Sequence, residues 1–516
     1  MNPRSHRPPG HAGKREHYLT RIAKDLEHII IRAQGSLAYS TLCLSNSKIQ
    51  ELASVLVEFA EDIHNNIRIW KSLERYNSEF FGTPLPFILQ PNEDMGQEAI
   101  NKQRIQHLLW VLYSELNLGL LISPTHRDLK KLATIIADFL GKRFADIPRV
   151  SSVKAFLSGP NHFGWEVKKK LIWLGTDSYL FRNSFRNYVE DHGGKPEIPV
   201  IDDFVCQQTT AWSGLGAIDI LAAILNISEE QRSTLRSWRE RHTAYYRILA
   251  TEDHKSEVMN IINEKQYTVR YSADKNPFEI GTIVFGSLVP WDREWYWCGT
   301  QHIFGNITEE TLQELKETFL KKVPEIAYRY CHQLAEKANQ TVDHHYHEFV
   351  EYHGADLAIY SDGLSMAADY QKEIRLQWES KPKEDIAKVM ERLKLKAPLP
   401  SLSFPQDLIE NDRGVGVYYN PDEGKEIMTG FNFIVSGFKK KGMDLTMDEE
   451  KGIRSFIFSD MVSPKFVRRL IQEYGSESIE AAFLIRGRYD ESHVNYLLRR
   501  YKGAYYRNRY PRVALL

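Results

Sequence analysis

Apolar residues at three- and four-residue steps dominate the first half of the chain. One uninterrupted run of this kind consists of Leu52, Val55, Leu56, Phe59, Ile63, Ile67 and Trp70. This spacing puts the apolar side chains on one face of an α-helix. Comparable patterns predict a helical region over residues 16–148 and a second helical region over residues 149–258.

The second helical region contains a well-defined helix start at Ser228. A capping serine is followed there by Glu229 and Glu230, whose negative charge favours the first turn of a helix. The apolar positions that fit this helix are Leu235, Trp238, Tyr245 and Leu249. We therefore expect the helix to continue to Leu249.

The spacing changes near residue 259, where short runs rich in β-branched and aromatic residues begin. These runs occupy residues 266–271, 281–291 and 294–304, and Asp292-Arg293 provides a tight turn between the last two. Such runs with short connections predict a small antiparallel meander or barrel over residues 259–305. Helical spacing then returns over residues 306–381, interrupted by one short strand at 357–360.

Prolines at positions 382, 398, 400 and 405 predict a linker over residues 382–411. Beyond it, a strand-turn-strand pattern and helix starts at Thr446 and Ser463 predict a C-terminal α+β unit over residues 412–485. We expect the two ends of the chain, residues 1–15 and 486–516, to be a disordered basic arm and a basic Tyr/Arg-rich tail. The fold class predicted is α+β, with a mainly helical body, a small antiparallel β meander or barrel, and a C-terminal α+β unit.

Charge and cysteine content narrow the functional classes. The 516 residues include 67 Lys and Arg against 68 Asp and Glu, which excludes a global basic field and leaves only a local patch for nucleic acid. No apolar run approaches the about 20 residues that span a bilayer, so we expect no membrane partner. The four cysteines are scattered without metal-site spacing, which is typical of a reducing cytoplasm.

A histidine-rich segment is the sharpest candidate for metal chemistry. On a helix, Asp343, His344, His347 and Glu351 share one sector, and imidazole and carboxylate groups are ligands of divalent metals. Val342, Tyr346 and Phe349 define the opposite, apolar face. The competing interpretation is therefore a solvated helix face, and no cofactor is predicted.

The meander at residues 286–301 carries Trp291, Trp295, Tyr296 and Trp297 within seven positions, and these rings could either form a stacking surface or, as we favour, fill a core. Strand alternation places Trp295 and Trp297 on one face and Tyr296 on the other. Tyr296 is therefore the aromatic surface candidate, whereas the two tryptophans are expected to fill the core of a small barrel.

The C-terminal tail combines positive charge with aromatic rings. Between Arg486 and Arg512 the chain carries eight Lys and Arg, two acidic residues and six tyrosines. Basic groups neutralise phosphates and aromatic rings stack on bases, so this composition predicts nucleic-acid contact. The candidate contact residues are Arg499, Arg500, Arg507, Arg509 and Arg512. The alternative is a terminal helix that docks on the body through Val494, Leu497 and Leu498.

Several short motifs resemble those of a family of bacterial proteins known as a domain of unknown function. The matching segments are Ile122-Ser123-Pro124, Trp173-Leu174, Asp203-Phe204, Trp212-Ser213-Gly214-Leu215, Gly286 to Trp291 and Glu294 to Gly299. The resemblance spans most of residues 100–485. It implies a bacterial cytosolic protein and brings no activity, cofactor or catalytic residue.

Two functional hypotheses follow from these patterns. The first is a non-enzymatic binding or scaffold protein, whose partner is nucleic acid contacted through the basic C-terminus or else another protein. The second is a metal-dependent enzyme that uses the sector with His344 and His347. The basic aromatic tail is the more coherent feature and favours the first hypothesis, while the sequence leaves open whether the protein is an enzyme.

Overall fold

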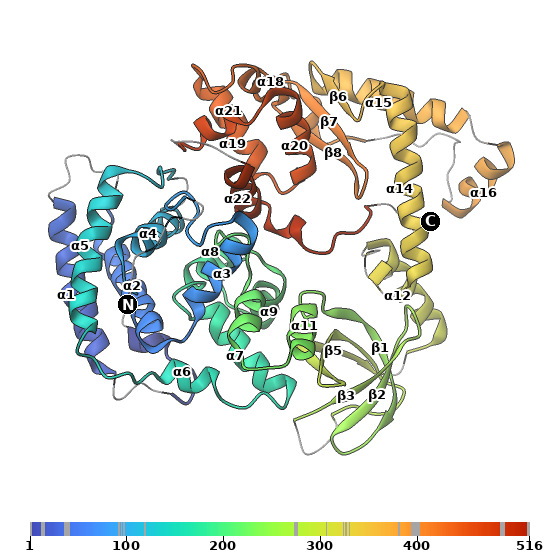
Figure 1. The fold of residues 1–516 in the computed structure, drawn as a ribbon. Coiled ribbons are helices and arrows are strands. Elements are labelled where there is room, and N and C mark those ends of the chain that lie inside the picture. The colour runs from blue at the N-terminus through green and yellow to red at the C-terminus, as the bar shows by residue number, and fades with distance from the viewer. Residues whose placement is uncertain are drawn as a thin grey trace. The chain divides into compact units, whose positions relative to one another are not determined.

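Helices form most of the protein, and two small sheets accompany them (Figure 1). The computed structural model describes all residues except 1–2, 12–15, 36–41, 91–92, 94, 96–98, 118–119, 273–276, 306, 323–324, 326–327, 330, 380–381, 394–402, 486–490 and 513–516. The contacts divide the chain into two units, Met1–Cys331 with Leu484–Arg507, and His332–Phe483 with Asn508–Leu516. The predicted α+β class is confirmed.

The helices of the first unit follow one another from the N-terminus to residue 237. They are η1 (Pro3–His6), α1 (His17–Gly35), α2 (Asn46–Asn65), α3 (Ile69–Phe81), α4 (Lys102–Leu116), α5 (Arg127–Phe144), α6 (Ser152–Leu157), α7 (Gly164–Thr176), α8 (Arg182–Asp191), α9 (Ile198–Gln207), α10 (Ala217–Ile224) and α11 (Glu229–Ser237). Three more elements of this unit lie later in the chain, α12 (Glu309–Lys322), α22 (Glu491–Tyr501) and η3 (Gly503–Tyr506). No helix among the described residues is long and apolar enough to cross a membrane.

The run of apolar residues from Leu52 to Trp70 is divided between two helices. Asn66 and Arg68 adopt positive φ angles of 52° and 84°, which end α2 and start α3. The carboxylate of Asp62 accepts hydrogen bonds from the backbone N–H groups of Ile69 and Trp70, at 3.2 and 2.7 Å. A buried side chain of α2 therefore caps α3, and the apolar period continues through a bend.

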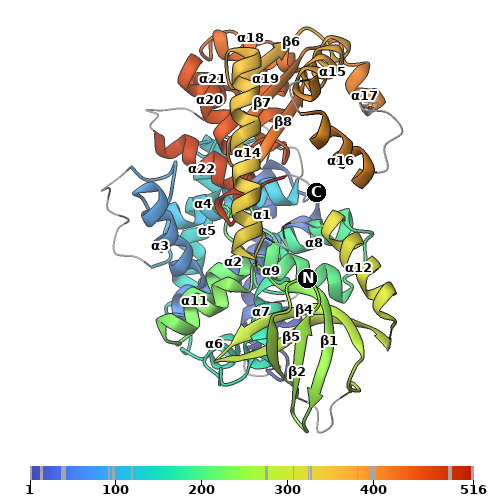
Figure 2. The ribbon, with the colours of Figure 1, turned by 90° about the vertical axis from the view of Figure 1, so that its right-hand side faces the viewer.

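The β region of the first unit is a closed five-stranded barrel (Figure 2). Its strands are β1 (His242–Thr251), β2 (Lys255–Asn260), β3 (Gln266–Arg270), β4 (Ile283–Trp291) and β5 (Glu294–Gly305), in the order β1-β2-β3-β5-β4. The turn between β4 and β5 places Asp292 and Arg293 at positive φ, which is typical of a tight hairpin. The predicted small barrel is present, with two strands more than the sequence indicated.

The expected helix from Ser228 to Leu249 is wrong beyond residue 237. Ser228 caps α11 as predicted, since its hydroxyl accepts a hydrogen bond from the N–H of Gln231 at 3.1 Å. The chain then becomes β1, where Ala244, Tyr246 and Ile248 point into the barrel core. This segment pairs with β2 on one side and with β4 on the other. Its inward residues follow a two-residue period, but Tyr245 and Leu249 also fit a helical spacing and so obscure that period.

The second unit is built around a three-stranded antiparallel sheet of order β6-β7-β8. Its elements are α14 (His332–His353), β6 (Leu357–Tyr360), α15 (Gly363–Glu379), α16 (Lys383–Leu393), α17 (Gln406–Ile409), β7 (Val415–Asn420), β8 (Gly424–Thr429), α18 (Phe431–Lys439), α19 (Met447–Phe458), α20 (Pro464–Tyr474) and α21 (Glu477–Ala482). Capping by Thr446 and Ser463 occurs as predicted.

The sheet of the second unit joins residues on both sides of the predicted linker. Strand β6 precedes residues 382–411 and pairs with β7, which follows them. Helix α16 lies within the predicted linker. Residues 394–402 of that linker lie outside the described residues. Residues 412–483 therefore share their sheet and core with α14, β6 and α15, because β7 pairs with β6.

Buried ion pairs join the N-terminal segment and α8 to α2. Arg182 of α8 is 2% exposed and contacts Glu51 at 2.5 Å and Glu58 at 2.6 Å. Arg7, which follows η1, contacts Glu61 at 2.7 Å and Glu16 at 3.2 Å. This ordered placement of Arg7 differs from the disordered arm expected over residues 1–15.

We expect Arg182→Met to lower the free energy of unfolding by about 3–5 kcal/mol, because Glu51 and Glu58 would stay buried without their closest cation. Urea denaturation followed by tryptophan fluorescence measures the change. The control Arg143→Met removes a half-exposed arginine that pairs with Asp25, and it should cost at most about 1 kcal/mol. Equal losses in the two variants would contradict the importance assigned to the buried pairs.

Candidate functional site

The C-terminal segment of the first unit packs against a glycine-containing loop, residues 209–216. Gly214 has a φ of +68°, and a Cβ built on it would lie 2.2 Å from the carbonyl oxygen of Arg499 at the end of α22. A Cβ on Gly503 would lie 2.7 Å from the Thr209 hydroxyl. Only glycine at these positions allows the two backbones to approach so closely. The Trp212-Ser213-Gly214-Leu215 motif therefore serves as the docking place of α22 and η3.

Helix α22 is anchored by an aromatic and apolar face. Val494, Leu497 and Leu498 are buried, as the docking alternative predicted. Tyr496 is fully buried and stacks on Trp110, with ring centroids 5.6 Å apart. Arg500 is also buried: its guanidinium lies over Trp110 and donates to the Ser114 hydroxyl at 2.6 Å. Arg500 is thus an internal residue of the first unit.

Arg499 lies on the other side of α22, between two aromatic rings. Its guanidinium carbon is 3.6 Å from the ring centroid of Phe80 and 4.4 Å from that of Tyr506. Burial lowers the pKa of Arg499 below its ordinary value. Cation–π contacts on this scale fix the guanidinium in one place.

Arg507 follows η3 and meets Arg239 at a single carboxylate. Both guanidinium groups pair with Asp219, Arg239 through Oδ1 and Arg507 through Oδ2 at 3.7 Å. Asp219 also accepts the N–H of Gly216 at 2.7 Å. The pKa of Arg239 falls to about 10 because of burial and the nearby Arg507, and burial lowers that of Arg507 to about 10 as well.

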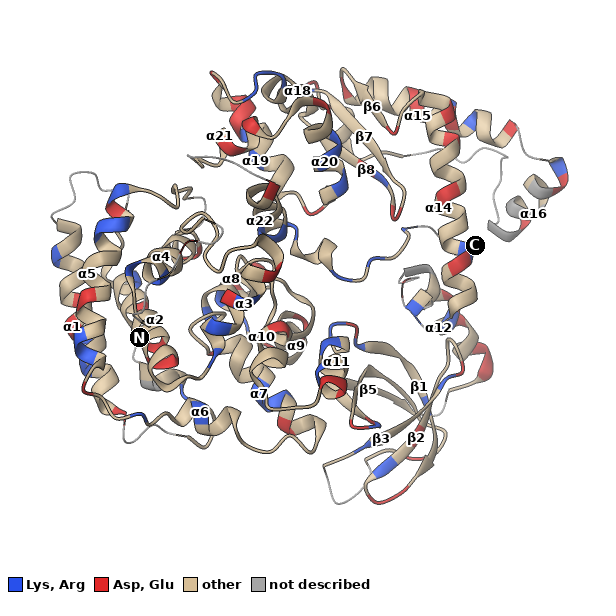
Figure 3. Ribbon diagram, viewed as in Figure 1, with Lys and Arg blue, Asp and Glu red and all other residues tan. Residues whose placement is uncertain are grey.

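These residues line one cavity of about 520 Å³, which we call the arginine cleft. Its lining comprises Arg75, Tyr76, Glu79, Phe80, Gly214, Leu215, Asp219, Glu229, Arg232, Arg236, Arg239, Arg499, Gly503, Tyr506 and Arg507. Six arginines thus face three acidic residues. Figure 3 shows both signs of charge on α11, whose Glu229 holds Arg232 at 3.0 Å and Arg236 at 3.5 Å. The balance of the cleft is positive, which favours an anionic ligand.

Arg499 and Arg507 of this cleft were predicted from the sequence, whereas the arginines of α3, α11 and the turn after α11 were not. Arg232, Arg236 and Arg239 follow one another at steps of four and three residues, which places them on one side of the chain. That spacing could have indicated a basic surface at this part of the chain. These arginines meet α22 and η3 through contacts between residues more than 260 positions apart. Arg239 and Arg507, which both contact Asp219, are one example. Sequence periodicity does not encode such contacts.

Arg509 and Arg512 lie in the second unit, against its β7–β8 turn. Arg509 donates two hydrogen bonds to the carboxylate of Glu423, at 2.9 and 2.7 Å, and Arg512 contacts the same carboxylate at 3.2 Å. The backbone N–H of Arg512 also donates to the carbonyl oxygen of Glu423 at 2.8 Å. The five arginines predicted for one nucleic-acid surface are therefore divided among the cleft, the core and this turn.

Tyr296 lies on the outer face of the barrel, as strand alternation predicted, but it is only 4% exposed. Helix α7 covers it: a Cβ on Gly164 would lie 2.7 Å from the Tyr296 ring, and Trp165 meets the ring edge-on at 5.5 Å. Tyr296 is thus a buried contact between barrel and helix, and its interpretation as a surface aromatic is wrong. Trp295 and Trp297 pack against the barrel core.

The histidine sector of α14 faces solvent. His344 is 67% exposed and lies 3.2 Å from Glu348, whereas His347 is 72% exposed and lies 3.7 Å from Asp343. Glu351 is exposed as well, and Val342 and Phe349 are buried in the core of the second unit. Within the described part of the chain, no group of three or more His, Cys, Asp or Glu residues is arranged to hold a metal ion. The geometry therefore does not favour the metal-dependent alternative.

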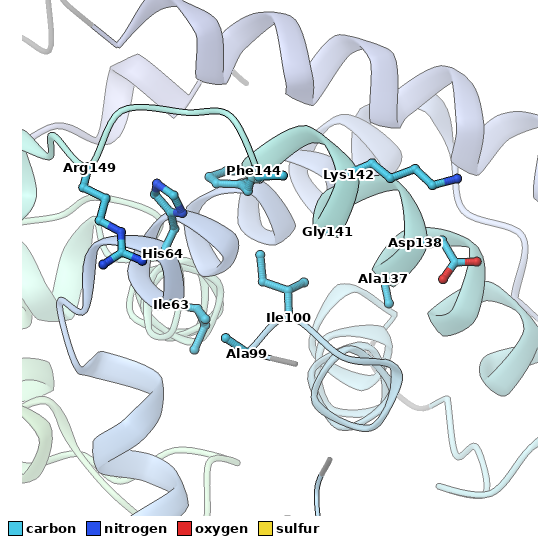
Figure 4. A pocket seen from close by; sticks show the side chains of 11 residues that line it. Ile63, His64, Ala99, Ile100, Ala137, Asp138, Gly141, Lys142, Phe144 and Arg149 are labelled. Carbon is cyan, nitrogen blue, oxygen red and sulfur yellow. The ribbon is translucent and has the colours of Figure 1, made fainter. Parts of the chain in front are cut away.

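A larger cavity has a volume of about 600 Å³. It is lined by α5, by the C-terminal end of α2 and by the residues just before α4. Its polar groups do not converge: Figure 4 shows Lys142 and Asp138 extending away from His64 and Arg149. His64 is already bonded to the carbonyl oxygen of Ile147 at 2.9 Å. We therefore take the arginine cleft as the candidate site.

The fold and the cleft define an α+β protein in which α22 and η3 pack back onto the first unit and contribute to an arginine-lined cleft. Residues 14–204 match a family model described as "Protein of unknown function (DUF3843)". This match confirms the expected resemblance to a domain of unknown function, and it runs from α1 into α9, so the motifs at residues 212–215 and 286–299 lie outside it. Neither the curated proteins nor the solved structures contain a match.

We expect Gly214→Ala to release α22 and η3 from the loop at residues 209–216. The added methyl group would overlap the Arg499 carbonyl and would also strain the positive φ, at a cost of about 1–3 kcal/mol for the strain alone. Limited trypsin digestion checks this, since Arg499, Lys502 and Arg507 should be cut earlier than in the wild type. The control Gly193→Ala has a φ of +91° and no atom within 4 Å of the new Cβ. Early cleavage of the C-terminus in both variants would show that strain, rather than the close approach, is responsible.

Proposed function

We propose that the first unit binds the phosphate of a nucleotide, free or at the end of a nucleic-acid strand, in the arginine cleft. The observation that carries the proposal is the sharing of Asp219 by Arg239 and Arg507. Two guanidinium groups on one carboxylate keep uncompensated positive charge. Partial burial strengthens the attraction of that charge for an anion, because water screens it less.

The chemistry of the cleft suits phosphate in particular. Guanidinium groups present paired N–H donors that match two phosphate oxygens, and such charge-assisted bonds are about twice as strong as neutral ones. Asp219 and Glu229 hold four of the arginines by ion pairs, so the donors are positioned before a ligand arrives. These carboxylates are engaged by arginine, which supports a binding function rather than general-base catalysis.

Size and lining favour a nucleotide over a bare inorganic anion. A volume of about 520 Å³ lies in the range of pockets for small organic ligands. Tyr76, Phe80 and Tyr506 contribute aromatic surface beside the arginines, and aromatic side chains are common neighbours of bases. We also infer a reducing cytoplasmic location, supported by the free state of all four cysteines.

The experiment compares ligand binding by the full chain and by two charge-matched double variants. Arg75→Gln/Arg239→Gln removes two positive charges from the cleft, whereas Arg509→Gln/Arg512→Gln removes two from the turn at Glu423. Fluorescence anisotropy with a labelled single-stranded oligonucleotide, competed by a mononucleotide and by inorganic phosphate, reports the affinities. We expect the cleft variant to bind at least about tenfold more weakly and to show a shallower salt dependence, since each lost phosphate contact releases one counterion fewer.

The competitors distinguish the sources of the nucleotide. Tight oligonucleotide binding that a mononucleotide displaces only weakly supports a strand end, and the reverse order supports a free nucleotide. The Glu423-turn variant should bind as the wild type does. Absence of binding at low salt, or equal weakening in both variants, would overturn the proposal, and an unchanged melting temperature excludes misfolding as the cause.

A further inference from the structure

A second polar cluster of the first unit brings together two cysteines that are 92 positions apart in the chain. Cys206 lies at the end of α9 and Cys298 lies in β5. The ammonium group of Lys168, from α7, is 3.0 Å from the Cys298 sulfur and 3.6 Å from the Cys206 sulfur. The two thiols also share a hydrogen bond. Three elements thus converge on one buried pair of sulfur atoms.

The charges around the pair are unequal. Lys168 and Arg241 bring two positive groups, and Asp202 of α9 brings one carboxylate, 2.5 Å from Lys168. Asp203 lies 3.7 Å from Arg241 at the edge of the cluster and is also bound by Tyr188 and Gln208. Asp202 is close enough to Gly299 that a Cβ there would lie 2.5 Å from its Oδ2 atom. The two cations can therefore accommodate a thiolate next to the one carboxylate that faces it directly.

Cys298 is the thiol best placed to carry that charge. The hydrogen bond from Cys206, followed by the field of Lys168 and Arg241, lowers the pKa of Cys298 to about 6, despite burial and Asp202. The same hydrogen bond and burial raise the pKa of Cys206. The opposite directions of the two pKa shifts favour a thiolate on Cys298, with Cys206 as the thiol that donates to it.

Cys298 and Lys168 line a cavity of about 370 Å³ beside the barrel. Its walls are aromatic, with Trp165, Trp238, Tyr296 and Trp297, and Arg270 contributes a further cation. Cys206 is buried and is not part of this lining. A small reagent that enters the cavity therefore reaches Cys298, whereas Cys206 does not border the cavity.

We propose that Cys298 and Cys206 are an oxidation site for small hydroperoxides, with Cys298 as the attacking residue and Cys206 as the resolving residue. The Cys298 thiolate attacks one oxygen of the hydroperoxide, the O–O bond breaks, and the departing alkoxide or hydroxide takes a proton from the Lys168 ammonium. The Cys206 sulfur then attacks the sulfenic acid on Cys298. The S–O bond breaks, water leaves with the thiol proton, and a disulfide forms. The two thiols lose two electrons and the hydroperoxide gains them.

The test treats the reduced full-length protein with hydrogen peroxide and follows it by intact mass and peptide mapping. We expect the wild type to lose the mass of two hydrogen atoms and to yield a cross-linked Cys206–Cys298 peptide. Cys206→Ser should instead gain one oxygen on Cys298, which dimedone traps. Cys298→Ser should form neither product, and the double variant Cys43→Ser/Cys331→Ser, which changes the other two cysteines, should react as the wild type does.

A measurement on the wild type keeps the proposal testable if a variant does not fold. Iodoacetamide labelling of Cys298, followed by peptide mass, should reach half its maximal rate near pH 6, because the thiolate is the nucleophile. Labelling of the exposed Cys43 in the same samples provides the internal control for the reagent. Oxidation of Cys43 while Cys206 and Cys298 stay reduced, or a Cys298 midpoint at or above the about 8.5 of a model thiol, would overturn the proposal.

Discussion

The close approach of two backbones, at Gly214 and at Gly503, is the constraint on which the candidate site depends. A side chain at either position would overlap the other segment, so α22 and η3 reach their place only because both residues are glycine. That contact fixes the ends of the segment from which Arg499 and Arg507 project. The buried Tyr496 and Arg500 then lock the same segment against α4. One backbone contact thus decides whether the arginine cleft exists.

Buried arginines occur in two different electrostatic environments in the first unit. Near α2, Arg7 and Arg182 are each in contact with two carboxylates. In the arginine cleft two guanidinium groups share Asp219, and four more arginines line the same space. Since an uncompensated buried charge is costly, the first arrangement stabilises the fold, whereas the second favours a ligand that completes the balance.

The cluster at Cys298 follows the same electrostatic logic with a smaller anion. Lys168 and Arg241 lie beside the two thiols, and their positive field favours the loss of a proton from Cys298. Tyr296 and Trp297 of the aromatic run contribute to the walls of the cavity that Cys298 also lines. The arginine cleft and the cavity at Cys298 have no lining residue in common, yet in both the positive groups favour a negatively charged partner.

The sequence by itself determined what depends on local spacing and local chemistry. The α+β class, the barrel strands from Gln266 onward, the β7–β8 hairpin and the caps at Ser228, Thr446 and Ser463 were predictable, because each depends on residues a few positions apart. Strand β1 was mistaken for helix, because Tyr245 and Leu249 also fit the helical spacing that begins at Leu235, although β2 and β4 pair with this segment. The tertiary structure alone decided the fate of Tyr296, the division of the C-terminal arginines and the meeting of Cys206 with Cys298. Contacts between distant segments determine burial and charge compensation, and a linear pattern of residue types does not contain those contacts.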